Sequence, residues 1–237
     1  MTEDFSTLTT EELFQRGGVQ VHDGLHFVYT GDDHGPGYAN LRPLAKPENL
    51  SVLRELSYRL LMATLKATGL DQQNVLMIGP QTLGMQIAKE AVNLFNCIHP
   101  VTNPMRAAAL IHDPADSDGF LWEEEAKSAL MERPPEQVIW VDDLMNKGST
   151  WRRTKDLIQD LFPDSIAAVA TIANRSQETA ESLGVLHFVS LCNISLERFP
   201  PEACPSCKSC VPIVTNLGHG AKFQAEHPDY PGGFTEL

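Results

Sequence analysis

Two adjacent acids, Asp142 and Asp143, follow the apolar stretch 138–141 and precede the polar loop 146–150. In an open parallel sheet, ligands bind beyond the carboxyl ends of the strands, where these acids are expected to lie. Neighbouring carboxylates suit the vicinal hydroxyls of a ribose, because each hydroxyl can donate a hydrogen bond to one acid. The loop would present backbone N–H groups at a helix N-terminus, which is a ready site for phosphate. The segment therefore predicts a site for a ribose 5-phosphate.

The composition of the predicted phosphate loop suits an anion. The loop consists of Asn146, Lys147, Gly148, Ser149 and Thr150. Its two hydroxyls and its one positive charge would add to the backbone donors. The alternative is an ordinary strand-end turn whose two acids are merely solvated. The acids alone would favour that alternative, whereas the acids, the loop and the following helix together favour the ribose-phosphate site.

The elements that must position these residues alternate along the chain. Short apolar segments predict strands at 75–78, 107–111, 138–141, 166–172 and 185–191. Helical spacing of apolar residues predicts helices at 47–69, 83–95, 157–161 and 178–183. We expect residues 113–135 to form a mobile connection, with or without a short helical piece. This alternation predicts an α/β fold with right-handed crossovers and a twisted, mostly parallel sheet flanked by helices.

Composition restricts the classes of partner. The chain has 237 residues, of which 42% are hydrophobic, and a formal net charge of −13. Such a charge repels phosphate backbones and anionic membrane surfaces, so neither nucleic acid nor a membrane is an expected partner. The first residues, MTEDFSTLTTEELF, show no secretory signal, and no apolar run is long enough to span a membrane. A cytoplasmic protein with small-molecule substrates is the expectation.

Several segments resemble one family in the same order along the chain. Residues 138–150 resemble the phosphoribosyl-pyrophosphate (PRPP) motif of type I phosphoribosyltransferases, and most resemble the orotate phosphoribosyltransferase branch. Residues 78–84 resemble that family's pyrophosphate loop. Residues 26–30, 34–35 and 38–42 resemble its N-terminal hood and substrate-binding segment, and the tail at 204–207, 212–213 and 218–220 resembles that of some members of the branch.

The resemblance implies a fold, an activity and a site. The implied parts are an N-terminal hood segment (1–45), a phosphoribosyltransferase-like α/β core (46–199) and a C-terminal appendage rich in Cys, Gly and His (200–237). The implied enzyme is a homodimer that uses Mg²⁺ and transfers phosphoribosyl from PRPP to a nitrogenous, pyrimidine-like base with release of pyrophosphate. Asp142 and Asp143 would hold the ribose hydroxyls, and 146–150 the 5-phosphate. The other implied site residues are Gln81, Thr82, Leu83 and Gly84 at the pyrophosphate and Phe27, Tyr29, Tyr38 and Arg42 at the base.

Two departures from the family pattern bear on catalysis. Asp33 stands where the family commonly has a lysine before the His-Gly pair, and residues 112–126 contain no Lys or Arg where the family has a cationic mobile loop. Those cations neutralise the pyrophosphate charge that develops as the glycosidic bond breaks. No catalytic residue is therefore assigned. The alternative function is a non-catalytic sensor that binds PRPP or a nucleotide and has lost turnover.

The tail carries three cysteines at metal-ligand spacing. Cys204, Cys207 and Cys210 form a C-x₂-C-x₂-C pattern, and a structural Zn²⁺ would need a fourth ligand, either His219 or Cys192. Reduced thiols without metal are the alternative, because no second C-x₂-C pair exists. A zinc-dependent interaction module is a further possible function for this tail.

Overall fold

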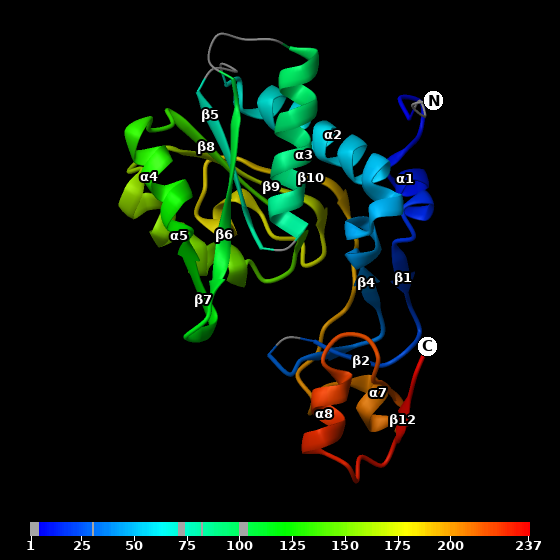
Figure 1. The fold of residues 1–237 in the computed structure, drawn as a ribbon. Helices are drawn as coiled ribbons and strands as arrows, with labels where there is room; N and C mark the ends of the chain where they lie inside the picture. Colours follow the sequence, from blue (N-terminus) through cyan, green and yellow to red (C-terminus); the bar gives the residue numbers. More distant parts are fainter. Residues whose placement is uncertain (1–4, 30, 71–73, 82, 100–103) are drawn as a thin grey trace.

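The central feature of the computed structural model is a six-stranded sheet (Figure 1). The structure describes residues 5–29, 31–70, 74–81, 83–99 and 104–237, with the backbone alone at 117 and 118. The strand order is β10-β9-β8-β5-β6-β7, in which only the edge strand β7 runs antiparallel to its neighbour. The strands are β5 (Val75–Pro80), β6 (Arg106–Asp113), β7 (Asp116–Trp122), β8 (Gln137–Met145), β9 (Ile166–Asn174) and β10 (Phe188–Asn193). The predicted α/β class is confirmed.

Helices cover both faces of this sheet, because its central strands are apolar on both sides. Met77, Ile139 and Val141 belong to the core on the side of α2 and α3, whereas Ile78 and Trp140 belong to the core on the side of α4 and α5. Successive strand residues thus alternate between two hydrophobic cores. The helices are α1 (Thr10–Arg16), α2 (Leu50–Thr68), α3 (Leu83–Ile98), α4 (Glu124–Glu132), α5 (Ser149–Leu161) and α6 (Ala180–Leu183), with 3₁₀ turns η1 (Arg42–Ala45) and η2 (Pro47–Asn49).

The helix predicted over 47–69 is confirmed in position. Its leucines at three- and four-residue steps, such as Leu53, Leu56 and Leu60, are fully buried against the sheet. Gly69 ends it in the left-handed region, with φ of 67° and its N–H donated to the carbonyl of Leu65. Glycine reaches this conformation without a steric penalty, which explains the stop. None of the helices in the described part of the chain is both long and apolar enough to cross a bilayer.

The connection expected over 113–135 contains a strand that was not predicted, whereas its expected short helical piece is present as α4. Residues 116–122 form β7, which pairs with β6 as a hairpin, and α4 follows directly. Trp122 explains the order of this segment, because its ring is buried and its Nε1–H donates to the carbonyl of Leu157 at 3.1 Å. The charged residues that suggested mobility lie at the hairpin tip and along the exposed side of α4.

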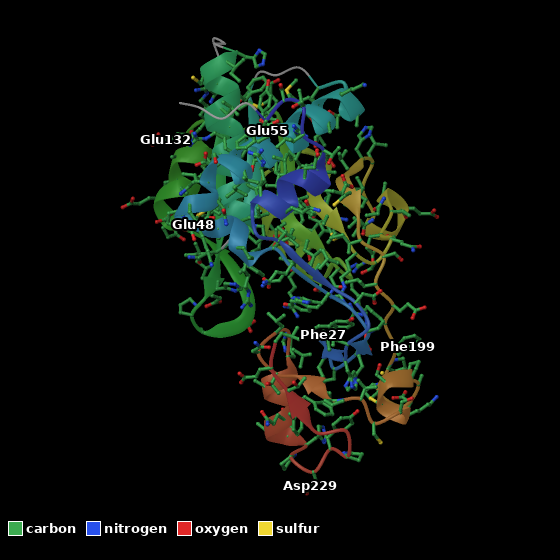
Figure 2. The ribbon with its side chains drawn as sticks, turned by 90° about the vertical axis from the view of Figure 1, so that its right-hand side faces the viewer. Phe27, Glu48, Glu55, Glu132, Phe199 and Asp229 are labelled. Carbon is green, nitrogen blue, oxygen red and sulfur yellow. The ribbon has the colours of Figure 1, made fainter. Side chains whose placement is uncertain are left out.

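A small second lobe contains residues from both ends of the sequence, as the side view in Figure 2 shows with Phe27, Phe199 and Asp229 labelled. We call residues 26–35 and 204–235 the hood–tail lobe. The carbonyl of His26 accepts from the N–H of Val214, and that of Val28 accepts from the N–H of His219, each at 2.9 Å. Its elements are β2 (Phe27–Val28), β3 (His34–Gly35), α7 (Pro205–Lys208), β11 (Ile213–Val214), α8 (Gly220–Glu226) and β12 (Phe234–Thr235). The paired strands β1 (Gln20–His22) and β4 (Tyr38–Asn40) connect it to the α/β core.

Candidate functional site

The acid pair Asp142 and Asp143 lies in a stretch of β8 that has a neighbour on one side only. The predicted strand ended before the acids, but β8 continues to Met145. Pairing with β5 stops at Trp140, whereas pairing with β9 continues, for example from Asp142 to Thr171. The β5 side of the acid pair is therefore free for a ligand, at the carboxyl ends of the parallel strands.

Electrostatics at the acid pair favours a ligand that brings hydrogen-bond donors or positive charge. Both side chains are half-buried, and the N–H of Asp143 donates to Oδ1 of Asp142 at 2.9 Å. Burial, and then the charge of Asp143, raises the pKa of Asp142 well above its usual range. Burial likewise raises the pKa of Asp143. Two such carboxyl groups hold negative charge at a cost that hydroxyl donors or a cation would offset.

The loop from Asn146 to Thr150 leads directly into α5. Gly148 has φ of 65°, and a Cβ at this position would lie 2.6 Å from Cδ2 of Leu183, so the turn requires glycine for two reasons. Ser149 and Thr150 begin the helix, where the first N–H groups have no partner within the helix. The predicted anion-binding geometry of strand, tight turn and helix N-terminus is present at this place in the fold.

The loop after β5 is folded closely against the acid pair. A Cβ on Gly79 would lie 2.1 Å from the carbonyl carbon and oxygen of Gly84. A Cβ on Gly84 would lie 3.2 Å from Oδ1 of Asp142. The two glycines therefore permit a close backbone approach that brings the N-terminus of α3 next to the acids.

A cavity of about 280 Å³ lies between this loop, the acid pair, η1 and the β6–β7 hairpin. Its lining residues are Arg42, Ala45, Pro80, Gln81, Leu83, His112, Phe120, Asp142, Asp143 and Thr150. Of the predicted pyrophosphate residues, Gln81 and Leu83 line it, and Thr82 lies outside the described residues. The cavity brings together residues from four separate predicted motifs.

A second cavity, of about 190 Å³, adjoins the first, since Arg42 lines both. Its lining residues are Tyr29, Tyr38, Ala39, Arg42, Leu144, Asn146, Arg175, Gly218 and His219. Phe27 does not line it; this ring is fully buried and stacks on Tyr38 with centroids 5.4 Å apart. Three of the four predicted base residues, Tyr29, Tyr38 and Arg42, therefore line one pocket, and Phe27 packs against Tyr38.

Arg175 brings a buried positive charge to this second cavity. It follows β9 directly, and its side chain is 3% exposed. The guanidinium carbon lies 3.8 Å from the centre of the Tyr29 ring, a cation–π arrangement. The hydroxyl of Tyr29 in turn donates to the carbonyl of Gly37. The pocket thus combines flat aromatic surface with a planar, five-donor cation.

Asp33 and Lys147, which are far apart in the sequence, contact each other. Nζ of Lys147 donates to Oδ2 of Asp33, and Nη2 of Arg198 donates to the same oxygen at 2.8 Å. Nη1 of Arg198 also donates to Oδ1 of Asn146 at 2.6 Å. The hood acid, which replaces a family lysine, is therefore neutralised by two cations and fixes the start of the phosphate loop.

The cysteine-rich tail is arranged differently from its predicted zinc set. Cys204 and Cys207 lie next to His26 and His34, and the four ligand atoms fall within 4.8 Å of one another. Cys210 is exposed and is not part of this group, which corrects its assignment as a ligand. The other predicted ligands are likewise elsewhere, since His219 lines the aromatic cavity and Cys192 lies in β10.

Comparisons with known proteins were made by sequence and by fold. No protein-family model matches the chain. A segment of 82 residues is 34% identical to an orotate phosphoribosyltransferase of Carboxydothermus hydrogenoformans, and it makes up 35% of this chain and 41% of that relative. A longer match of 189 residues, at 23% identity, covers 80% of this chain and 86% of an orotate phosphoribosyltransferase of Caldicellulosiruptor bescii.

The fold comparison agrees with these matches. The crystal structure of orotate phosphoribosyltransferase from Francisella tularensis matches with a TM-score of 0.50 at 13% identity, covering 93% of this chain and 98% of that one. The chain is thus similar in sequence to orotate phosphoribosyltransferases. Its sheet and flanking helices have the fold of these type I phosphoribosyltransferases, and the resemblance noted in the sequence is confirmed at that level.

Relative to this phosphoribosyltransferase pattern, sequence reasoning missed two pairs of residues. Arg175 and Arg198 stand outside every motif. The fold alone brings Arg175 to the pocket from the end of β9, and Arg198 to Asp33 from the linker after β10. His26 and His34 were assigned to the hood alone. Their spacing of eight residues around a short hairpin was the available signal, because such a hairpin places both on one face.

Proposed function

We propose that this protein is a phosphoribosyltransferase that binds PRPP at the β8 acid pair and transfers the phosphoribosyl group to a nitrogenous base. The observation that carries the proposal is the meeting of Asp142 and Asp143 with two helix N-termini at the edge of one sheet. The acids would accept hydrogen bonds from the ribose hydroxyls. The N-terminus of α5, with residues 146–150, would hold the 5-phosphate, and the loop before α3 would face the pyrophosphate.

The adjoining aromatic cavity would take the base. Tyr38 offers a flat surface, and Arg175 offers several N–H donors to a carbonyl or carboxylate oxygen. Arg42 lies between the two cavities and its charge also lowers the pKa of Asp143, opposing the effect of burial. A planar, pyrimidine-like base with acceptor oxygens fits this chemistry.

Magnesium would enter the site as the counter-ion of the pyrophosphate of PRPP. The hairpin that borders the first cavity carries Asp113 and Asp116 and no Lys or Arg between 112 and 126. These carboxylates repel a pyrophosphate unless a hard cation with a preference for oxygen ligands lies between them. PRPP binding should therefore depend more strongly on Mg²⁺ than it would with a cationic loop.

A non-catalytic PRPP sensor is the second candidate, and the same acidic hairpin favours it. The arrangement at 142–150 would serve binding. Cations in the hairpin would serve the later step, in which charge develops on the leaving pyrophosphate, and residues 112–126 contain no Lys or Arg. A sensor would bind PRPP with the same site residues and release no pyrophosphate with any base.

Calorimetric titration with PRPP, with and without Mg²⁺, tests the binding site. We expect saturable, Mg²⁺-dependent binding that is weakened in Asp143→Asn and kept in the matched control Asp156→Asn, which changes an exposed acid on α5. Absence of binding at millimolar PRPP would contradict both candidates. A pyrophosphate-release assay over a panel of pyrimidine and purine bases then separates the enzyme from the sensor. Sedimentation of the same preparation tests the homodimer that the resemblance implies.

A further inference from the structure

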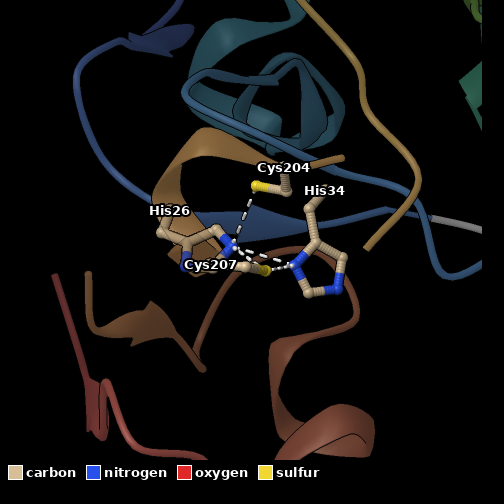
Figure 3. A group of neighbouring side chains, drawn as sticks. All are labelled: His26, His34, Cys204 and Cys207. Carbon is tan, nitrogen blue, oxygen red and sulfur yellow. Dashed lines mark hydrogen bonds between the residues drawn. The ribbon is translucent and has the colours of Figure 1, made fainter. Parts of the chain in front are cut away.

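Four potential metal ligands converge inside the hood–tail lobe, as Figure 3 shows. Nε2 of His26 lies 2.9 Å from Nδ1 of His34. Sγ of Cys207 lies 3.6 Å from Nε2 of His26 and 3.1 Å from Nδ1 of His34. Sγ of Cys204 lies 3.7 Å from Nε2 of His26. Two nitrogens and two sulfurs therefore surround one point.

These separations are close to those of a tetrahedral zinc site. Zn–S bonds of about 2.3 Å and Zn–N bonds of about 2.0–2.1 Å place neighbouring ligand atoms roughly 3.3–3.8 Å apart in a tetrahedron. The two nitrogen–sulfur distances at His26 already fall in this range, and the other two need to lengthen by a few tenths of an ångström. The set is also closed, because four protein ligands leave no open position for a substrate.

Local structure fixes the ligand side chains in place. Cys204 caps the N-terminus of α7 and Cys207 lies within that helix, so both sulfurs face the same side. In the β2–β3 hairpin, His34 pairs with Val28. His26 precedes Val28 by two residues, so it lies on the same face of the hairpin as Val28 and His34. The histidine pair and the cysteine pair are far apart in the sequence, and only the fold brings them together.

The surroundings of His26 also fit metal ligation. Nδ1 of His26 lies 2.9 Å from the carbonyl oxygen of Val211, to which it can donate its proton. That bond directs the lone pair of Nε2 toward the cluster, as carbonyls that accept from the other ring nitrogen of a ligating histidine do at zinc sites. His26, His34 and Cys204 have no exposed surface, and Cys207 is half-buried. A buried group of this kind is stabilised only if its polar atoms find partners.

The apolar core of the lobe is small. Its buried apolar cluster consists of Phe27, Tyr29 and Val214, with a few half-buried neighbours. Small units with such limited cores commonly depend on a metal or on disulfides. We propose that these two histidines and two cysteines bind one structural Zn²⁺ ion, which joins the hood to the tail. This site does not rest on the phosphoribosyltransferase function.

Binding would release protons in a defined number. Each of the two cysteines binds as a thiolate, so two S–H bonds break and two Zn–S bonds form, while the neutral imidazoles bind through lone pairs. No change of oxidation state occurs. Two protons should therefore appear in solution for each Zn²⁺ bound at a pH where the free thiols are protonated.

Metal analysis of the full chain, purified under reducing conditions, tests the site. We expect one zinc per chain by elemental mass spectrometry, and one equivalent regained when chelator-treated protein is titrated with Zn²⁺. Co²⁺ in place of zinc should give the visible spectrum of a tetrahedral site with thiolate ligands. Zinc-depleted protein should be cut by protease within 200–237 faster than the zinc form, because the tail would lose its attachment.

The third cysteine of the same motif provides a matched control. Cys207→Ser and His34→Ala should lower the zinc content at least tenfold, whereas Cys210→Ser should keep one equivalent, because Cys210 is outside the group. Absence of zinc from wild-type protein together with failure to bind added Zn²⁺ or Co²⁺ would overturn the proposal without bearing on PRPP binding. Full retention of zinc in Cys207→Ser, its loss in Cys210→Ser, or stoichiometric iron or copper in place of zinc would overturn it as well.

Discussion

The α/β core and the hood–tail lobe are stabilised in different ways. In the core, Ile78 and Trp140 are among many side chains with no exposed surface, arranged on both faces of a sheet. In the lobe, a small buried apolar cluster of Phe27, Tyr29 and Val214 accompanies a cluster of imidazole and thiol groups. Burial of apolar surface, which has no preferred direction, stabilises the α/β core. Directional polar contacts between distant segments stabilise the hood–tail lobe. The candidate site lies where the two meet, because its acids come from the core and Tyr29 comes from the lobe.

Truncation of one large side chain in each region should give the largest difference between the α/β core and the hood–tail lobe. Ile78→Ala should destabilise the whole protein by about 2–5 kcal/mol, since it leaves a cavity in the sheet core. Phe27→Ala, which removes a fully buried ring of the lobe, should leave the main unfolding transition in place and speed cleavage of the tail. Differential scanning calorimetry and limited proteolysis measure the two effects. Equal lowering of the main transition by both variants would mean that the regions unfold as one unit.

Removing one charge from the acid pair tests the contribution of the core to the site. Asp143→Asn should weaken PRPP binding about 10- to 150-fold, which corresponds to the loss of a charged hydrogen bond of about 1.5–3 kcal/mol. The fold should be unchanged, since the side chain is half-buried and the amide has the same shape. Calorimetric titration gives the affinity and circular dichroism checks the fold. Unaltered affinity would remove the acids from the site.

The same acids should make stability depend on pH in an unusual direction. Burial raises the pKa of Asp142, and an acid with a higher pKa in the folded chain than in the unfolded chain stabilises the fold less as pH rises through the folded pKa. The free energy of unfolding should therefore fall as pH rises above the ordinary carboxyl range. Asp142→Asn should reduce this dependence and raise the melting temperature near neutral pH by about 2–4 °C, equivalent to about 1 kcal/mol. A melting temperature that falls at neutral pH would contradict the repulsion between the acids.

The smallest effect is expected at the contact between the two regions. Lys147→Ala should weaken PRPP binding only a few-fold, because this side chain is 58% exposed and is already paired with Asp33. A double-mutant cycle with Asp33→Asn, read by PRPP affinity, should give a coupling energy of about 0.5–1 kcal/mol. A coupling of zero would show that Lys147 and Asp33 act independently.

Local sequence patterns predicted the parts of the fold that local physics determines. The leucine spacing of α2, its stop at Gly69 and the buried strand before Asp142 follow from periodicity and backbone preferences. The β6–β7 hairpin was missed because its acidic residues outweighed Phe120 and Trp122 in the interpretation, although those rings bury it. Tertiary packing prevailed there over local composition.

The same limit of local patterns explains why only part of the site was predicted. The acids and the loop to Thr150 are contiguous, so one segment of sequence contains them. Arg175 and the ligand pair His26 and His34 acquire their neighbours from segments far away in the chain. Spacing rules apply within one element, and no such rule connects a hairpin near the N-terminus with a short helix near the C-terminus.

The contact of Lys147 and Arg198 with one oxygen of Asp33 also restricts how this sequence can change over generations. Reversal of the charge at 33 alone would bring three cations together, whereas loss of the charge at 147 leaves Asp33 paired with Arg198. The two positions should therefore vary as a pair among descendants of this chain. An exchange that starts at 147 keeps Arg198 as a partner for the acids at 33 and 147, which makes that order of substitution the accessible one.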